Sequence, residues 1–121
     1  MTKLFLIAFG GALGAPFRYF INDLMKNSSF FSLPIGIMLV NFIGCFCIGM
    51  AMAQISDLKS NIYFFLVIGF FGSFTTMSAF SQQTIELLYN GKELNALIYV
   101  VASIASCLIG TFLAYSLFKT T

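Results

Sequence analysis

Few residues of this sequence could do chemistry, and most of those are uncharged. Histidine is absent, which removes the commonest metal ligand and general base. The acidic residues are Asp23, Asp57, Glu86 and Glu93, and each lies near the end of a long apolar stretch. No two carboxylates are placed for acid–base work, so we expect no enzymatic activity. A net charge of +2 without a basic stripe also argues against nucleic-acid binding.

The cysteines, Cys45, Cys47 and Cys107, all lie inside apolar stretches. There is no CxxC pair and no cysteine in a predicted loop, so the sequence indicates neither a disulfide framework nor a zinc site. Cys45 and Cys47 would point to nearly opposite sides of a helix. We expect them to be packing residues.

Polar residues gather at four places within the apolar stretches. In hydrocarbon such groups are costly unless satisfied, so they usually face another helix or a water-filled path. The four places are Gly10, Gly11 and Gly14 followed by Arg18; Asn41; the segment 72–83; and Tyr99, Ser103 and Cys107, which are spaced by four and so share one helix face.

Three of these places have a purely structural interpretation beside a functional one. Gly10 and Gly14 form a pair of small residues that most often indicates close helix packing. Arg18 either reaches the lipid headgroups or lines an aqueous vestibule. Asn41 either makes an interhelical hydrogen bond or serves a transport path. Ser103 either bonds to its own backbone or faces a partner.

The segment 72–83 is poor helix material. Gly72 is followed by Ser73, Thr75 and Thr76 at a depth where lipid cannot satisfy open backbone groups. A break there is tolerated only where it is buried in protein or lines a cavity. The alternative is an intact helix whose hydroxyls bond locally. If the helix breaks, its free carbonyls become a candidate cation site.

Four membrane-spanning helices must position these residues. The chain has 121 residues, of which 60% are hydrophobic and 8% charged, with a mean hydropathy of +0.97. A soluble domain carries about 25% charged residues, and a helical span needs about 20 apolar ones. We expect an all-α membrane protein with one domain over 1–121 and spans at about 4–24, 34–55, 63–88 and 94–118. Pro34 suits a helix start, Asn90-Gly91 indicates a turn, and the first stretch is expected to be retained rather than cleaved as a signal peptide.

The basic residues leave the orientation in the membrane open. Four spans put both chain ends on one face, with Lys3, Lys59 and Lys119 there and Lys26 and Lys92 on the other, joined by Arg18 if it is close enough to the interface. Because an excess of positive residues marks the cytoplasmic face, this near balance gives no clear answer. Either a small bias fixes one topology, or the chain inserts both ways and pairs as an antiparallel homodimer.

Three sequence motifs match a known family. The run GGALGAPFRY at 10–19 resembles the GGxxGAxxRY opening of the Fluc (CrcB) family of small fluoride channels. The run GIMLVNFIG at 36–44 resembles that family's second-helix motif G(T)xxVNxxG, and 69–81 resembles its GxxGGxTTFSTFS. The motifs occur in order, one per predicted helix, and the resemblance covers essentially the whole chain.

The resemblance implies a dual-topology, antiparallel homodimer in the cell (inner or plasma) membrane, with two fluoride pores lined by both subunits. It assigns a structural sodium ion to backbone carbonyls of Gly72 and Thr75 from each chain. It places Asn41 on the permeating anion and Phe80 with its ring edge toward fluoride. Ser78, Tyr99 and Ser103 would form a polar track, and Arg18 would lie near the vestibule.

This sequence departs from the family pattern at several positions. Ser73 replaces a glycine, Ala79 a threonine, Gln83 a usual glutamate, and Cys107 a serine that would continue the polar track. Met77 stands where the first pore phenylalanine is usual. An aromatic ring edge is electropositive and can face an anion, whereas a thioether offers only a weakly electropositive methyl group.

Passive fluoride export is therefore the function we expect. The first alternative is a small proton-coupled multidrug exporter, which needs a carboxylate inside the membrane. Spans one, two and four have none in their interiors, and Glu86 lies near the end of span three. The second alternative is an inert subunit of a larger complex.

Overall fold

Four helical spans form the molecule, as the sequence predicts. The computed structural model describes residues 1–27, 29–30 and 33–119. The spans are α1 (Thr2–Leu24), α2 (Ile35–Gln54), a composite third span (Tyr63–Tyr89) and α5 (Glu93–Phe118). Each is long and apolar enough to cross a bilayer, so the chain is a multi-pass membrane protein. The helix ends differ from the predicted ones by at most two residues.

The third span is interrupted near its middle, which confirms the predicted break. It comprises a π-helix, η1 (Tyr63–Phe71), one short turn, α3 (Gly72–Phe74), and then α4 (Met77–Tyr89). Between α3 and α4 the backbone is extended at Thr75 (φ −80°, ψ 156°) and Thr76 (φ −149°, ψ 122°). The π-helix was not predicted from the sequence.

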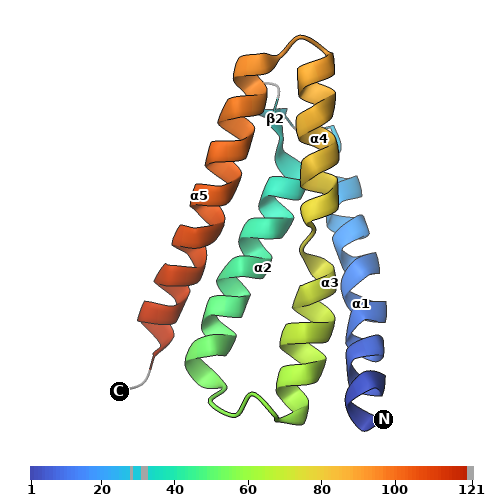
Figure 1. Cartoon of the computed structure of the whole chain (residues 1–121), viewed down its shortest axis with the longest axis vertical. Coiled ribbons are helices and arrows are strands. Elements are labelled where there is room, and N and C mark those ends of the chain that lie inside the picture. The colour runs from blue at the N-terminus through green and yellow to red at the C-terminus, as the bar shows by residue number, and fades with distance from the viewer. Residues whose placement is uncertain (28, 31–32, 120–121) are drawn as a thin grey trace.

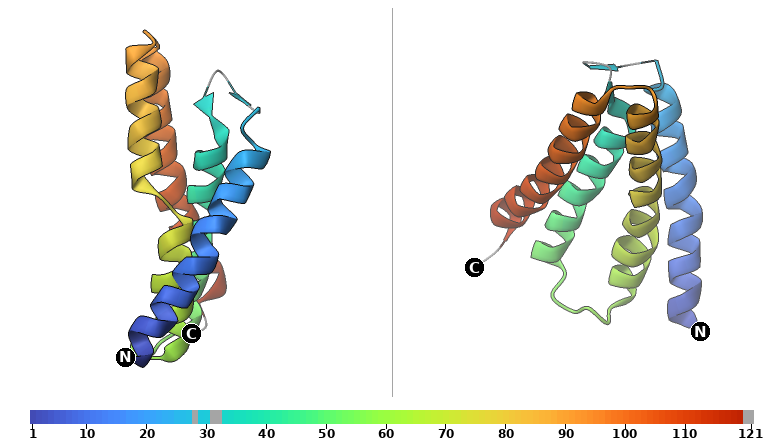
Figure 2. Two further views of the ribbon diagram at one scale, coloured as in Figure 1. Left: turned by 90° about the vertical axis from the view of Figure 1, so that its right-hand side faces the viewer. Right: turned by 45° about the horizontal axis from the view of Figure 1, so that its top comes forward.

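The helices are arranged as two packed pairs joined at the third span (Figure 1). α1 lies along η1 and α3, and α2 lies along α5. After the break, α4 packs against α5 and leans away from the upper end of α1 (Figure 2, left). Both termini lie at the same end of the molecule, as four spans require.

Glycines bring α1 directly against the backbone of the third span. Gly10 and Gly14 are the buried residues of α1. A Cβ atom at Gly10 would meet the carbonyl oxygen of Phe65, and one at Gly14 would meet the carbonyl oxygen of Phe70. Only glycine allows so close an approach, so the predicted packing role of this pair is confirmed.

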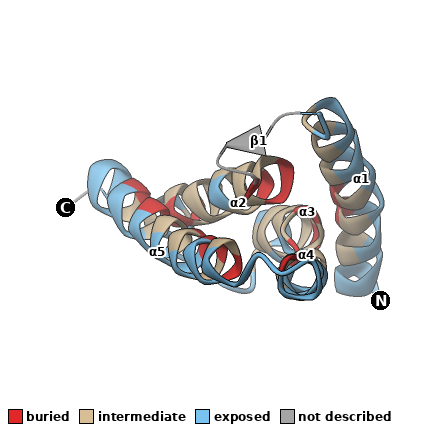
Figure 3. Ribbon diagram, turned by 90° about the horizontal axis from the view of Figure 1, so that it is seen from above, coloured by how far each residue is buried: buried red, intermediate tan, exposed pale blue. Residues whose placement is uncertain are grey.

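The buried core is small. Its largest fully buried side chains are Val40, Phe74 and Tyr99. Large apolar side chains such as Phe5, Leu108 and Phe112 are instead about two-thirds exposed. Seen from above, exposed residues cover the outer helix faces and buried ones face the neighbouring helices (Figure 3). Large apolar side chains therefore cover the outside of the molecule, as a lipid environment requires.

The connections follow the predicted turn signals. Gly91 has φ +76° and lies in the turn between α4 and α5, as expected for Asn90-Gly91. Pro34 directly precedes α2 rather than opening it, because it pairs in a two-residue antiparallel ladder of β1 (Ser29–Phe30) with β2 (Leu33–Pro34). Ser28 of this connection and the terminal Thr120 and Thr121 lie outside the described residues.

Candidate functional site at the break in the third span

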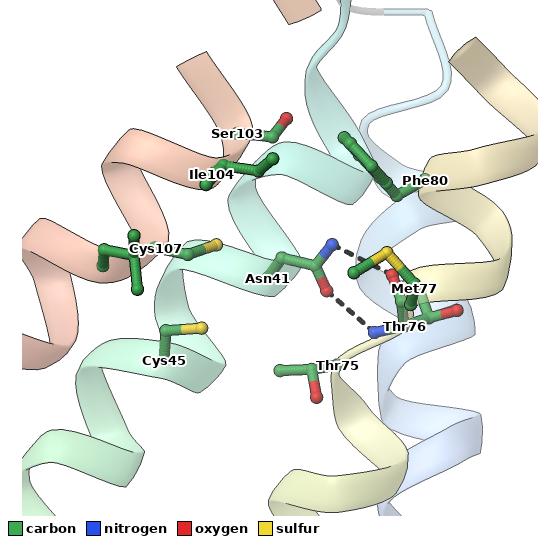
Figure 4. Close-up of a pocket in the computed structure, with 10 residues that line it drawn as sticks. Asn41, Cys45, Thr75, Thr76, Met77, Phe80, Ser103, Ile104 and Cys107 are labelled. Carbon is green, nitrogen blue, oxygen red and sulfur yellow. Dashed lines mark hydrogen bonds between the residues drawn. The ribbon is translucent and has the colours of Figure 1, made fainter. Parts of the chain in front are cut away.

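A side chain of α2 holds the break open. The Oδ1 atom of Asn41 accepts the backbone N–H of Thr76 at 2.8 Å, and its Nδ2 donates to the carbonyl of Thr76 at 3.0 Å (Figure 4). The amide therefore replaces helix hydrogen bonds that Thr76 has given up. This contact satisfies open backbone groups inside the membrane, where no lipid group could do so.

Two backbone carbonyls lose their helical partners at the break. In an unbroken helix the carbonyl of Gly72 would accept the N–H of Thr76, which here donates to Asn41. The carbonyl of Thr75 would accept the N–H of Ala79, which instead donates to the hydroxyl of Thr76 at 3.2 Å. In the part of the chain that the structure describes, no hydrogen bond to either carbonyl is found.

Hydroxyl groups complete the local structure of the break. Thr76 is the N-cap of α4, and its hydroxyl lies 3.1 Å from the hydroxyl of Ser78. The hydroxyl of Thr75 donates back to the carbonyl of Phe71 at 3.0 Å. The helix is thus broken within the segment 72–83 because its own threonines and Asn41 offer the backbone groups there other hydrogen-bond partners.

A cavity of about 310 Å³ opens beside the break (Figure 4). It is bounded by α2, by the start of α4 and by α5. Five of the predicted site residues line it together, namely Asn41, Thr75, Met77, Phe80 and Ser103; Cys45, Thr76, Ile104, Cys107 and Leu108 complete the wall. None of these ten residues is charged.

Ser103 is an unpaired hydroxyl in this wall. It is 4% exposed, and its Oγ has no hydrogen-bond partner among the described residues. The expected alternative, a bond to its own backbone, is therefore absent for the described residues. A buried hydroxyl without a partner costs about 1–3 kcal/mol, so this position is suited to a polar ligand.

Tyr99 lies beside the cavity rather than among its lining residues. It is fully buried, its ring packs against Phe80 with centroids 5.3 Å apart, and its hydroxyl donates to Oε1 of Gln83 at 2.7 Å. Gln83 was not predicted as a site residue. The signal for it was its place in the polar segment, where it departs from the family pattern.

The remaining predicted residues lie apart from the cavity wall. Gly72 is exposed at the start of α3, and Ser78 is exposed near the start of α4. Arg18 lies on α1, partly buried, and its Nε is buried without a hydrogen-bond partner among the described residues.

The arrangement suits a small ion held by neutral dipoles. Amide and hydroxyl donors, freed carbonyls and an aromatic ring meet within one membrane-embedded region. The described residues contain no group of three or more His, Cys, Asp and Glu side chains that could hold a metal ion. Selectivity by neutral groups at close quarters is how many ion pathways work.

Comparison with known proteins identifies the family of this chain. The family described as "CrcB-like protein, Camphor Resistance (CrcB)" matches residues 5–115. The chain belongs to the CrcB family. The match includes all three of the motifs that position α1, Asn41 and the break.

Curated relatives are similar to this chain over nearly their whole length. A protein of Parabacteroides distasonis named "Fluoride-specific ion channel FluC" is 40% identical over 121 residues, which is 98% of this chain and 94% of that protein. A protein of Shewanella baltica (strain OS185) with the same name is 38% identical over 119 residues, covering 97% and 96% respectively.

Proposed function

We propose that this chain is a passive, fluoride-selective ion channel. The observation that carries the proposal is the cavity at the break, whose wall is uncharged and presents hydrogen-bond donors from both α2 and α5. The CrcB relatives described above are named as fluoride-specific ion channels, and this chain covers nearly their full length.

Fluoride is small and strongly hydrated, so a pore must replace its water with several donors, none of which traps the ion. A primary amide has two N–H donors. Asn41 uses one on Thr76, so the other is left for an anion. Ser103 adds its unpaired hydroxyl, and Phe80 offers an electropositive ring edge. The methyl group of Met77 takes the place of a second aromatic edge.

Other polar groups would extend the path beyond the cavity. Ser78 is exposed, and its hydroxyl contacts the hydroxyl of Thr76. The hydroxyl of Tyr99 donates a hydrogen bond to Gln83 and so connects the cavity region to that side chain. Arg18 would raise the electrostatic potential for anions at the vestibule through its positive charge, and its Nε has no hydrogen-bond partner in the described part of the chain.

The functional unit in this proposal is an antiparallel homodimer with two pores. Gly72, Met77 and Ser78 are exposed near the break in the third span, and Met77 is 71% exposed. A second, inverted copy would cover these residues and close the open side of each cavity. Because a two-fold axis duplicates every contact, one interface yields two equivalent pores.

A structural sodium ion fits the groups at the break. The carbonyls of Gly72 and Thr75 lack hydrogen-bond donors among the described residues, and hard cations prefer oxygen ligands. Two copies would supply four such oxygens near the axis. When bound, the ion would supply fixed positive charge that favours anions without any titratable side chain.

Transport would be passive. A membrane potential that is negative inside drives an anion outward by about 2.3 kcal/mol per 100 mV. A proton-coupled exporter of organic cations is less well supported, because no carboxylate lines the cavity.

Fluoride efflux from liposomes tests the proposal. The purified chain is reconstituted into vesicles loaded with potassium fluoride, and release is followed with a fluoride electrode after a potassium ionophore is added. We expect rapid release that does not depend on a proton gradient, and far slower release of chloride. Proton-coupled movement of an organic cation would favour the exporter, whereas no flux together with a co-purifying protein would favour a subunit role.

A further inference from the structure

Two cysteines from different helices meet in the wall of the cavity. Cys45 comes from α2 and Cys107 from α5, and both sulfur atoms are seen on the same side of the cavity (Figure 4). Cys47 does not line the cavity, as its offset of two positions from Cys45 requires.

The helices on either side fix this juxtaposition. α2 and α5 pack along one another. The hydroxyl of Thr111 donates to the backbone carbonyl of Cys45 at 2.9 Å, and so ties α5 to α2 one turn beyond Cys107. Farther along, Gly49 lies directly against the backbone of Thr111, where a Cβ atom would collide with its carbonyl oxygen. The fold therefore places both thiols in the wall of the same cavity.

The geometry points to a binding site for one soft monovalent metal ion, Cu(I) or its analogue Ag(I), between Cys45 and Cys107. Thiolate sulfur selects such ions over hard cations. Binding forms a metal–sulfur bond to one thiol and releases its proton to water, while the second thiol donates a lone pair. The resulting unit of one cation and one thiolate is neutral, which avoids burying a net charge in the membrane.

Other metals fit the site poorly. Structural zinc takes four ligands, and the cavity wall holds neither histidine nor carboxylate. Met77 lines the opposite wall, and its thioether is also soft, which favours the same class of ion.

A bound ion would occupy the cavity that also contains Asn41 and Ser103. The bound metal ion should block fluoride flux. This expected effect on transport rests on the proposed function, whereas the metal site itself does not. Binding itself is measured without any flux.

The binding test uses silver and the full-length protein. The purified chain is reduced, freed of reductant and titrated with silver nitrate in detergent, and bound ions are counted by native mass spectrometry. We expect one tightly bound Ag(I) per chain. Cys45→Ser and Cys107→Ser should each weaken binding by more than the roughly 10–100-fold that loss of an outer-shell partner costs. Cys47→Ser is the matched control and should bind as the original chain does.

Two results would overturn the site. One is equal loss of silver binding in Cys47→Ser, and the other is unchanged binding in both Cys45→Ser and Cys107→Ser. X-ray absorption of the unsubstituted protein loaded with Cu(I) avoids any dependence on how the variants fold. It should show sulfur ligands, and coordination by nitrogen or oxygen alone would contradict the proposal.

A second arm separates this inference from the proposed function. Silver should stop fluoride efflux from liposomes in the original chain and in Cys47→Ser but not in Cys107→Ser. If silver binds but the measured fluoride flux is unchanged, the metal site is supported and the cavity is not part of the fluoride pathway. Absence of fluoride flux with intact silver binding would count against the channel alone.

Discussion

Asn41 divides its hydrogen-bonding capacity between structure and ligand. Both polar atoms of its amide are engaged with Thr76, and one N–H remains. Its two interpretations from sequence, an interhelical hydrogen bond and a transport role, are therefore compatible. The first is confirmed, and the second stays a prediction that substitution tests.

Asn41→Asp should separate these roles. The carboxylate still accepts the N–H of Thr76, so the break should persist, but it places a negative charge beside the arriving anion. At about 4 Å two unit charges near a protein surface interact by about 4 kcal/mol, so fluoride flux should fall by roughly 100- to 1,000-fold. Liposome efflux measures the loss, and gel filtration checks that assembly is unchanged. Flux at the original rate would remove Asn41 from the pathway.

Ser103→Ala should change activity and stability in opposite directions. Its hydroxyl has no described partner, so its removal breaks no hydrogen bond and should raise stability by about 1 kcal/mol. Fluoride flux should fall roughly tenfold, which corresponds to the loss of one hydrogen bond to the ion. Ser106→Ala is the control on the same helix, because the Ser106 hydroxyl is bonded to the carbonyl of Ser103. Thermal unfolding in detergent and liposome efflux provide the two readouts, and equal flux in both variants would count against Ser103.

At the scale of helices, the contacts between spans decide where the chain departs from regular structure. The break was predictable because Gly72 and the threonines weaken the helix locally. The π-helix before it was not, since Tyr63–Phe71 is a uniformly apolar run that reads as an ordinary span. Nor was the meeting of Cys45 with Cys107, because that depends on how α2 and α5 are rotated against each other.

Gly14→Ala should weaken the packing of α1 on the third span. The added methyl group would meet the backbone carbonyl of Phe70, which cannot move aside easily. Overpacking of this kind costs about 1–3 kcal/mol, so the melting temperature in detergent should fall. Gly11→Ala is the matched control, since its Cβ would be crowded by the hydroxyl of Ser73, at 2.9 Å, which can rotate, while the backbone carbonyl of Gly69 is 3.8 Å away, at ordinary contact distance. Equal effects at the two positions would show that the close approach of Gly14 is unimportant.

For the whole molecule, composition alone predicts four spans and one domain. The spans were placed within two residues because charged residues and turns flank each apolar stretch. Orientation could not be predicted, since lysines are nearly balanced between the two ends. The proposed pairing of inverted copies follows from that balance together with the exposed residues near the break in the third span.

Dual orientation can be read out from the lysines. Lys3 lies at the end of the molecule that holds both termini, and Lys92 lies in the turn at the opposite end. A membrane-impermeant amine reagent added to sealed right-side-out vesicles should modify both lysines, each to a comparable partial extent. Peptide mass spectrometry quantifies the modification. Complete labelling of one lysine with protection of the other would establish a single orientation and rule out the antiparallel pair.

Because the Asn41 amide makes two hydrogen bonds to the backbone of Thr76, the shape of the third span depends partly on the sequence of α2. A synthetic peptide of residues 63–89 placed alone in lipid would lack the amide that occupies its vacant backbone groups, and should straighten into a continuous rod. If residues 63–89 were grafted into another protein, the sequence would be transferred but the break would not form, unless an asparagine equivalent to Asn41 were transferred as well.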